Sequence, residues 1–92
     1  MNYTDTQLKT ALAKMLPELI FESGDLYIYD TDFGIGGHRQ VFNTELLHLC
    51  WLVWETLPLH ERFRCYEILE SLIWATWQQR VVALAKVKGI KI

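Results

Sequence analysis

The chain has 92 residues, of which 51% are hydrophobic, and its nine basic and eleven acidic side chains give a net charge of −2. A chain of this length forms one domain. Its longest nearly apolar run, residues 46–54, is far shorter than the ~20 residues that span a bilayer, which excludes a membrane-spanning helix. Because the N-terminal residues also lack the apolar core of a signal peptide, we expect a cytoplasmic protein with no membrane partner.

The charges are unevenly distributed along the chain. Residues 1–70 carry all eleven acids and five basic side chains, a net −6, whereas residues 71–92 carry four basic side chains and no acid, a net +4. Four cations are too few for a typical nucleic-acid site, so we do not expect nucleic acid as a partner. The sequence suggests three functional hypotheses: a protein-binding module, a small-ligand or anion-binding protein, and a nucleic-acid-binding protein. The last, which would use Lys86, Lys88 and Lys91, is therefore the weakest.

The first predicted element is a helix over about residues 4–16. Thr4 and Gln7 have the spacing of a capping box, and apolar residues then recur at helical period. Pro17 disfavours helical geometry at the residue before it, so the helix is expected to end there.

A β-hairpin is predicted over about residues 19–30. Two short β-prone runs flank Ser23, Gly24 and Asp25, which supply turn chemistry. Residues 31–42 follow as a glycine-rich loop, and its last two residues, 41–42, are a candidate third strand.

Two helical patterns complete the chain, over about residues 44–57 and 59–87. Asn43 or Thr44 caps the first, and Pro58 separates the two. The order α–β–β–α–α predicts a small α+β domain, in which the hairpin packs beside a mainly helical core with a long C-terminal helix.

The helix over residues 59–87 is the longest predicted element. At ~1.5 Å per residue it is about 42 Å long, whereas a compact domain of this size has a radius of gyration of about 12 Å. We therefore expect its end to overhang the body. The overhang would leave four apolar residues without cover from the rest of the domain: Val81, Val82, Leu84 and Val87.

Four tryptophans lie in two pairs with i, i+3 spacing, Trp51 with Trp54 and Trp74 with Trp77, so each pair shares one helix face. We expect at least two of the four in the core and the others on a surface that a partner buries. The first pair lies on a helix that is apolar around most of its circumference. This pattern predicts a central helix with burial on two sides, the second of them within the domain or against another subunit or a partner.

The predicted binding surface is the aromatic sector of the last helix. Its candidate partner-binding residues are Tyr66, Glu70, Trp74, Trp77 and Arg80. Glu70 lies among aromatic residues on the helical wheel, where a carboxylate is unfavourable unless it is paired. Either Glu70 meets water or a cation there, or it is an acid at the floor of an aromatic pocket.

The glycine-rich loop is a second candidate site. Gly36, Gly37, His38 and Arg39 combine backbone N–H groups with positive charge, which suits an anion or a nucleotide. The spacing is neither that of a P-loop nor that of a dinucleotide-binding fingerprint. The alternative is a flexible turn that joins the hairpin to the next helix.

No sequence pattern indicates catalysis. Cys50 and Cys65 lie in apolar helical segments without CxxC spacing, which predicts buried reduced thiols rather than a disulfide or a metal site. No nucleophile lies at a productive spacing from a base. We therefore expect no enzyme activity, no metal and no cofactor.

The leading hypothesis is a small non-catalytic protein-binding module, an inhibitor or adaptor, that uses an aromatic and apolar helix surface. It would form a homodimer or dock on another protein through that surface. In size and aromatic content the chain has the general look of small bacterial or bacteriophage accessory proteins that bind a larger protein, although no motif carries this likeness. The alternative is a small-ligand or anion-binding protein that uses the glycine-rich loop.

Overall fold

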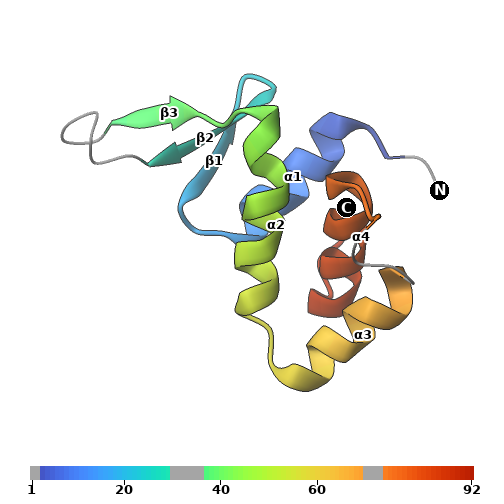
Figure 1. Cartoon of the computed structure of the whole chain (residues 1–92). Helices are drawn as coiled ribbons and strands as arrows, with labels where there is room; N and C mark the ends of the chain where they lie inside the picture. Colours follow the sequence, from blue (N-terminus) through green and yellow to red (C-terminus); the bar gives the residue numbers. More distant parts are fainter. Residues whose placement is uncertain (1–2, 30–36, 70–73) are drawn as a thin grey trace.

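The computed structural model describes residues 3–29, 37–69 and 74–92, which form an antiparallel sheet and four α-helices (Figure 1). The α+β class predicted from the sequence is confirmed. In chain order the elements are α1 (Asp5–Met15), β1 (Leu19–Glu22), β2 (Asp25–Tyr29), β3 (His38–Gln40), the 3-10 turn η2 (Asn43–Glu45), α2 (Leu46–Glu55), α3 (Leu59–Leu69) and α4 (Trp77–Lys88).

The capping box predicted for α1 is present. The backbone N–H of Gln7 donates to Oγ1 of Thr4 over 3.1 Å, and the backbone N–H of Thr4 donates to Oε1 of Gln7 over 2.9 Å. At the other end Leu16 is extended, as expected for a residue before Pro17. The helix buries an apolar face that consists of Leu8, Ala11, Leu12 and Met15.

The predicted hairpin is confirmed as β1 and β2, with Leu19 opposite Ile28. Its two turn residues, Ser23 and Gly24, have φ angles of 54° and 85°, the left-handed geometry that two-residue hairpins favour. The third strand is not at residues 41–42 but just before them, at β3, which completes the sheet order β1-β2-β3. The shift is small, because the N–H of Val41 still donates to the carbonyl of Leu26 over 2.9 Å.

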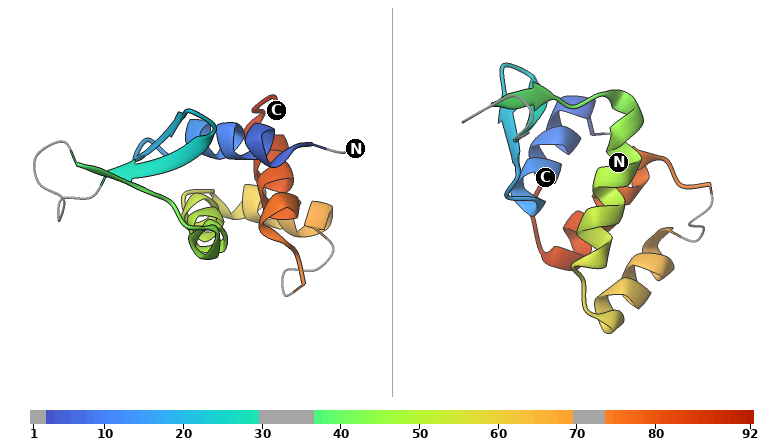
Figure 2. Two further views of the ribbon diagram at one scale, coloured as in Figure 1. Left: turned by 90° about the horizontal axis from the view of Figure 1, so that it is seen from above. Right: turned by 60° about the vertical axis from the view of Figure 1, so that its left-hand side comes forward.

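The last helix, α4, is the centre of the fold and packs against α1, α2 and α3. The sheet lies beside α1 at one end of the molecule, and α3 lies at the other end (Figures 1 and 2). The buried residues of α4 are Val81, Ala83, Leu84, Ala85 and Val87. Because these lie around most of the helix, α4 takes the central position that the sequence had suggested for residues 44–57.

The prediction of one helix over residues 59–87 is wrong. Helix α3 ends at Leu69 and α4 begins at Trp77, with Thr76 as its N-cap in an extended conformation. The N–H of Gln79 donates to Oγ1 of Thr76 over 3.2 Å, and the N–H of Thr76 donates to Oε1 of Gln79 over 2.9 Å. This second capping box starts a new helix, although the helical spacing of apolar residues continues through it. With α4 folded against α3, the predicted overhang does not occur.

The C-terminus of α4 is closed by Gly89, whose φ is 73°. The N–H of Gly89 donates to the carbonyl of Lys86, and the N–H of Ile90 donates to that of Ala85, which is the Schellman arrangement. The basic residues Lys86 and Lys88 lie in this last turn, where cations favour the helix dipole. Among the described residues, no helix has the length and apolar character needed to cross a bilayer.

The core is aliphatic, which contradicts the expectation that at least two tryptophans are core residues. Its largest fully buried side chains are those of Leu12, Leu26, Leu46, Val53, Val81, Cys50 and Cys65. Trp54 and Trp77 are only partly buried against this core. Trp51 and Trp74 remain 47% and 84% exposed.

We predict that Thr76→Ala lowers the free energy of unfolding by about 1 kcal/mol, because the N–H of Gln79 loses its acceptor. Urea titration monitored by circular dichroism measures this change. Thr76→Ser keeps the hydroxyl and is expected to remain near the wild type. Equal stability of the alanine and wild-type proteins would contradict a structural role for the cap.

Candidate functional site

The outer face of α2 carries a stripe of apolar side chains. Leu47, Trp51 and Trp54 have i, i+4 and i+7 spacing and therefore share one face. The neighbouring face of the helix is the one buried in the core, through Leu46, Leu49, Cys50 and Val53. The described residues of this chain do not cover the outer face, where Leu47 and Trp51 are half exposed, so burial of that side by another subunit or a partner stays a prediction.

Helix α3 carries a second stripe with the same spacing. Leu59, Phe63 and Tyr66 lie on one face, and each is exposed. Of the α3 residues whose burial is described, only Cys65 is fully buried. The helix is thus a ridge at one end of the molecule (Figure 1), and most of its large apolar side chains face outward.

The two stripes meet at Trp54. Its ring stacks on Trp51, with centroids 4.9 Å apart and planes at 21°, and meets the edge of Tyr66 at 5.9 Å and 89°. Both geometries are favourable for aromatic pairs. We call the continuous set Leu47, Trp51, Trp54, Phe63 and Tyr66 the α2–α3 aromatic surface.

Arg62 holds the junction between the two helices. Its Nε donates to the carbonyl of Leu57 over 2.9 Å, and its Nη2 donates to that of Glu55 over 2.7 Å. These are carbonyls at the C-terminal end of α2, where a cation also favours the helix dipole. The guanidinium carbon lies 4.6 Å from the centroid of Trp54, within the range of a cation–π contact. Arg62 therefore orients the aromatic ring at the centre of the surface.

The four described residues of the five predicted for partner binding do not lie on one helix. Tyr66 lies on the α2–α3 aromatic surface, and Trp74 is highly exposed just before α4. Trp77 is partly buried against the core, and the Nε of Arg80 donates to the carbonyl of Ala75 over 3.1 Å. Glu70 lies outside the described residues. The prediction assumed one continuous helix. Because α3 and α4 are separate helices, helical spacing no longer places Tyr66 on the same face as Trp77 and Arg80.

Four residues of the surface were not among the predicted site residues: Leu47, Trp51, Trp54 and Phe63. A signal was present, because bulky apolar residues recur at i, i+4 and i+7 both in 47–54 and in 59–66. The pattern could not show which apolar face of residues 44–57 would meet α4. That choice depends on packing between elements far apart in the chain.

A cavity of about 230 Å³ lies beside this surface, between α2, α3 and α4. Its walls include Cys50, Trp51, Trp54, Cys65, Leu69 and Arg80. Both cysteines are free and buried, as the sequence predicted. Burial raises the pKa of Cys50 to about 12, although the charge of Arg80 opposes the shift. Burial, assisted by the charge of Glu61, also raises the pKa of Cys65. Both thiols are thus neutral at physiological pH.

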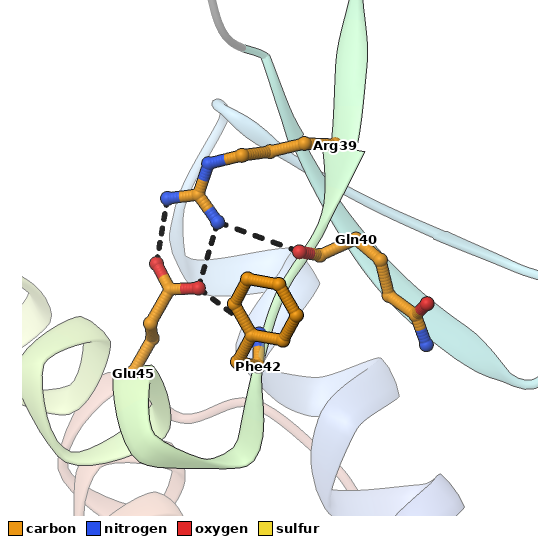
Figure 3. A network of polar contacts seen from close by, with 4 residues as sticks. All are labelled: Arg39, Gln40, Phe42 and Glu45. Carbon is orange, nitrogen blue, oxygen red and sulfur yellow. Dashed lines mark hydrogen bonds and ion pairs between the residues drawn. The ribbon is translucent and has the colours of Figure 1, made fainter.

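The glycine-rich loop contributes less positive charge than its sequence suggests (Figure 3). Arg39 forms a two-pronged ion pair with Glu45, with Nη1–Oε1 and Nη2–Oε2 distances of 2.7 and 2.6 Å. Oε1 of Glu45 also accepts the backbone N–H of Phe42 over 3.0 Å. His38 is exposed and meets the ring of Tyr29 edge-on. The guanidinium thus joins β3 to η2.

The structure describes only one of the two glycines in this candidate site. Gly37 is half-buried immediately before β3, and Gly36 lies outside the described residues. No group of three or more His, Cys, Asp or Glu side chains suited to a metal ion occurs within residues 3–29, 37–69 and 74–92.

Comparison with known proteins identifies no relative. No protein-family model, no curated protein and no solved structure matches this chain.

We predict that the Arg39–Glu45 pair makes stability depend on pH. Hydrogen bonds from the side chain of Arg39 and from the backbone of Phe42 lower the pKa of Glu45 from 4.5 to about 2. A carboxyl with a lowered pKa stabilises the fold above pH 4.5, and this contribution is lost as the pH falls toward 2. Because the pair is partly exposed, Glu45→Gln should lower the free energy of unfolding at pH 7 by on the order of 1 kcal/mol.

Urea titrations at several pH values between 3 and 7 measure the difference between wild type and Glu45→Gln. The difference is expected to shrink as the pH falls. Glu22→Gln, at an exposed carboxylate on β1, is the control. A difference that is constant with pH would show that the ion pair is not its source.

Proposed function

We propose that this chain is a small non-catalytic protein-binding module, an inhibitor or adaptor, whose binding site is the α2–α3 aromatic surface. The observation that supports this most directly is that the hydrophobic core closes without Leu47, Trp51 or Phe63. Large apolar side chains that share one exposed surface are typical of association sites.

The composition of the surface also supports the proposal. Tryptophan, tyrosine and arginine are the residues most enriched at binding hot spots, and Trp51, Tyr66 and Arg62 meet around Trp54. About half of Trp51 is exposed. Its burial by a partner would contribute roughly 2–3 kcal/mol, at ~25 cal/mol per Å² for half of a ~150–250 Å² side chain. That is the size of one hot-spot residue.

The contacts around Trp54 favour binding in a further way. The ring is held by Trp51 on one side, by the edge of Tyr66 and by Arg62. A side chain that is already ordered loses little conformational entropy when a partner covers it. The surface is therefore preorganised at its centre.

The occupant of the surface is a second copy of this chain or a different protein. A homodimer would be isologous, with the same surface facing itself across a two-fold axis. The sedimentation coefficient of the isolated chain, measured over a range of concentrations, separates the two cases.

The alternative, an anion site at Gly36, Gly37, His38 and Arg39, has weaker support. The carboxylate of Glu45 already binds two guanidinium nitrogens of Arg39. A bound anion would have to compete with this internal one. We therefore prefer the protein-binding module.

We predict that Phe63→Ser weakens association by roughly tenfold or more, because truncation of a hot-spot aromatic costs ~2 kcal/mol. The measurements are sedimentation for self-association and quantitative capture from a lysate for another partner. The matched control is Phe42→Ser. Phe42 and Phe63 are 64% and 63% exposed, and Phe42 directly precedes η2 at the N-terminal end of α2, whereas α3 follows the C-terminal end of α2.

The two variants must differ for the proposal to stand. Association that Phe63→Ser and Phe42→Ser weaken equally would indicate general stickiness rather than this surface. A chain that stays monomeric and captures the same proteins with or without Phe63 would disprove the assignment. Circular dichroism of both variants verifies that they fold.

A further inference from the structure

We infer that a groove between α2 and the junction of α1 with β1 is a binding site for a small organic cation, a protonated amine on an aliphatic body. The groove has a volume of about 480 Å³. Typical small-molecule sites have volumes of ~300–1,000 Å³. The groove shares no residue with the α2–α3 aromatic surface, so the inference goes beyond the proposed protein-binding function.

The groove lies on a different side of α2 from the aromatic stripe. Leu49, Leu52 and Thr56 line the groove and share one helix face, because their spacing is i, i+3 and i+7. At 3.6 residues per turn, this face is nearly opposite the one that residues 47, 51 and 54 occupy. A molecule in the groove therefore leaves the aromatic stripe free.

The apolar part of the wall is aliphatic. It consists of Leu16, Leu19, Ile28, Leu49 and Leu52. Leu16, Leu19 and Leu49 belong to the buried core, whereas Ile28 and Leu52 are only partly buried against it. No aromatic side chain lines the groove, so the wall offers dispersion contacts rather than ring stacking. This favours an aliphatic body for the ligand.

The polar side chains of the wall are hydrogen-bond acceptors. The carboxylates of Glu18 and Glu55 can only accept. The hydroxyl of Thr56 donates its one proton to the carbonyl of Val53 over 2.6 Å, so only its lone pairs remain for a ligand. An ammonium group has three donors and no acceptor, which matches such a wall. A carboxylate or carbonyl ligand would find no side-chain donor there.

The charge of the wall leads to the same ligand class. The wall has two acidic residues and no basic one, and both glutamates are exposed. Within the part of the chain that the structure describes, neither carboxylate has an ion-pair or hydrogen-bond partner. Arg62 binds the backbone carbonyl of Glu55, but it is not a wall residue and its guanidinium lies over Trp54. A bound cation would therefore neutralise charge that the fold leaves unpaired.

The same acceptors favour a small amine over a peptide segment. A peptide brings its own backbone carbonyls, and a buried carbonyl without a donor is unfavourable. The side chains of the wall supply no donor for these groups. An amine brings donors and apolar atoms only, which are the two kinds of group that this groove can accommodate.

The experiment compares three probes that share one aliphatic ring and differ in charge at pH 7. They are cyclohexylmethylamine, which is cationic, cyclohexylmethanol, which is neutral, and cyclohexanecarboxylate, which is anionic. Each is titrated into the full chain and followed by NMR. The methyl signals of Ile28 and Leu52 report on the groove, and the indole N–H signals of Trp51 and Trp54 report on the aromatic surface.

We expect the amine to shift the methyl signals of Ile28 and Leu52 to saturation. The alcohol should bind more weakly, by roughly twofold to fivefold, which is the worth of one exposed ion pair, and the carboxylate more weakly still. Glu18→Gln and Glu55→Gln should each weaken binding of the amine by a similar factor and leave that of the alcohol unchanged. Added salt should also weaken binding of the amine but not of the alcohol.

Glu22→Gln is the matched control, because Glu22 is an exposed carboxylate on β1 outside the groove wall. It should leave the affinity for the amine unchanged. Equal binding of the amine and the alcohol would overturn the inference, as would an affinity for the amine that neither Glu18→Gln nor Glu55→Gln lowers. Shifts confined to the indole signals would also overturn it, because they would place the cation on the aromatic surface.

Two further outcomes would assign the groove to another occupant and overturn the small-cation inference. Methyl signals of the groove that move on dilution of the chain without any probe would indicate a second copy. Tighter binding of a capped tripeptide with a central lysine would indicate a lysine of a protein partner. Phe63→Ser is expected to leave binding of the amine unchanged, so failure of this inference and failure of the proposed protein-binding surface are distinguishable.

Discussion

The packing of α4 against the other three helices is the constraint on which the rest of the structure depends. Helix α4 buries residues around most of its circumference, including Val81, Leu84 and Val87. It can do so because the capping box of Thr76 and Gln79 starts a new helix instead of continuing α3. Without that start, the same apolar residues would lie on a long helix with no cover.

The position of α4 also explains why the tryptophans are displaced from the core. Aliphatic side chains and two small thiols fill the space around α4, so the inner face of α2 contributes Leu49 and Val53 but no indole. The apolar residues of α2 that do not face the core then form the outer stripe, which includes Trp51 and Trp54. Exposed aromatic area is therefore a consequence of how the core closes, and it is the physical basis for both the surface and the cavity beside it.

Some of this could be predicted because the signals are local. Thr4 with Gln7, Pro17, and the turn at Ser23 and Gly24 each act within a few residues, and each has the expected geometry. The cap at Thr76 has the same spacing as that at Thr4, yet it lies within a continuous apolar period, and two local signals of opposite meaning cannot be ranked without packing. Likewise, no local rule pairs Arg39 with Glu45 rather than with an anion.

The sequence by itself determined the α+β class, the capped first helix, the hairpin and the two reduced, buried thiols. It also indicated that the chain has more aromatic side chains than a small core accepts. Only the tertiary structure decided which of them remain outside, because burial depends on which face of α2 meets α4. That contact joins residues more than twenty positions apart, such as Cys50 and Trp77, whose thiol and carbonyl meet at 3.8 Å. Periodicity reports the faces of one helix, whereas the choice between faces is made by the whole fold.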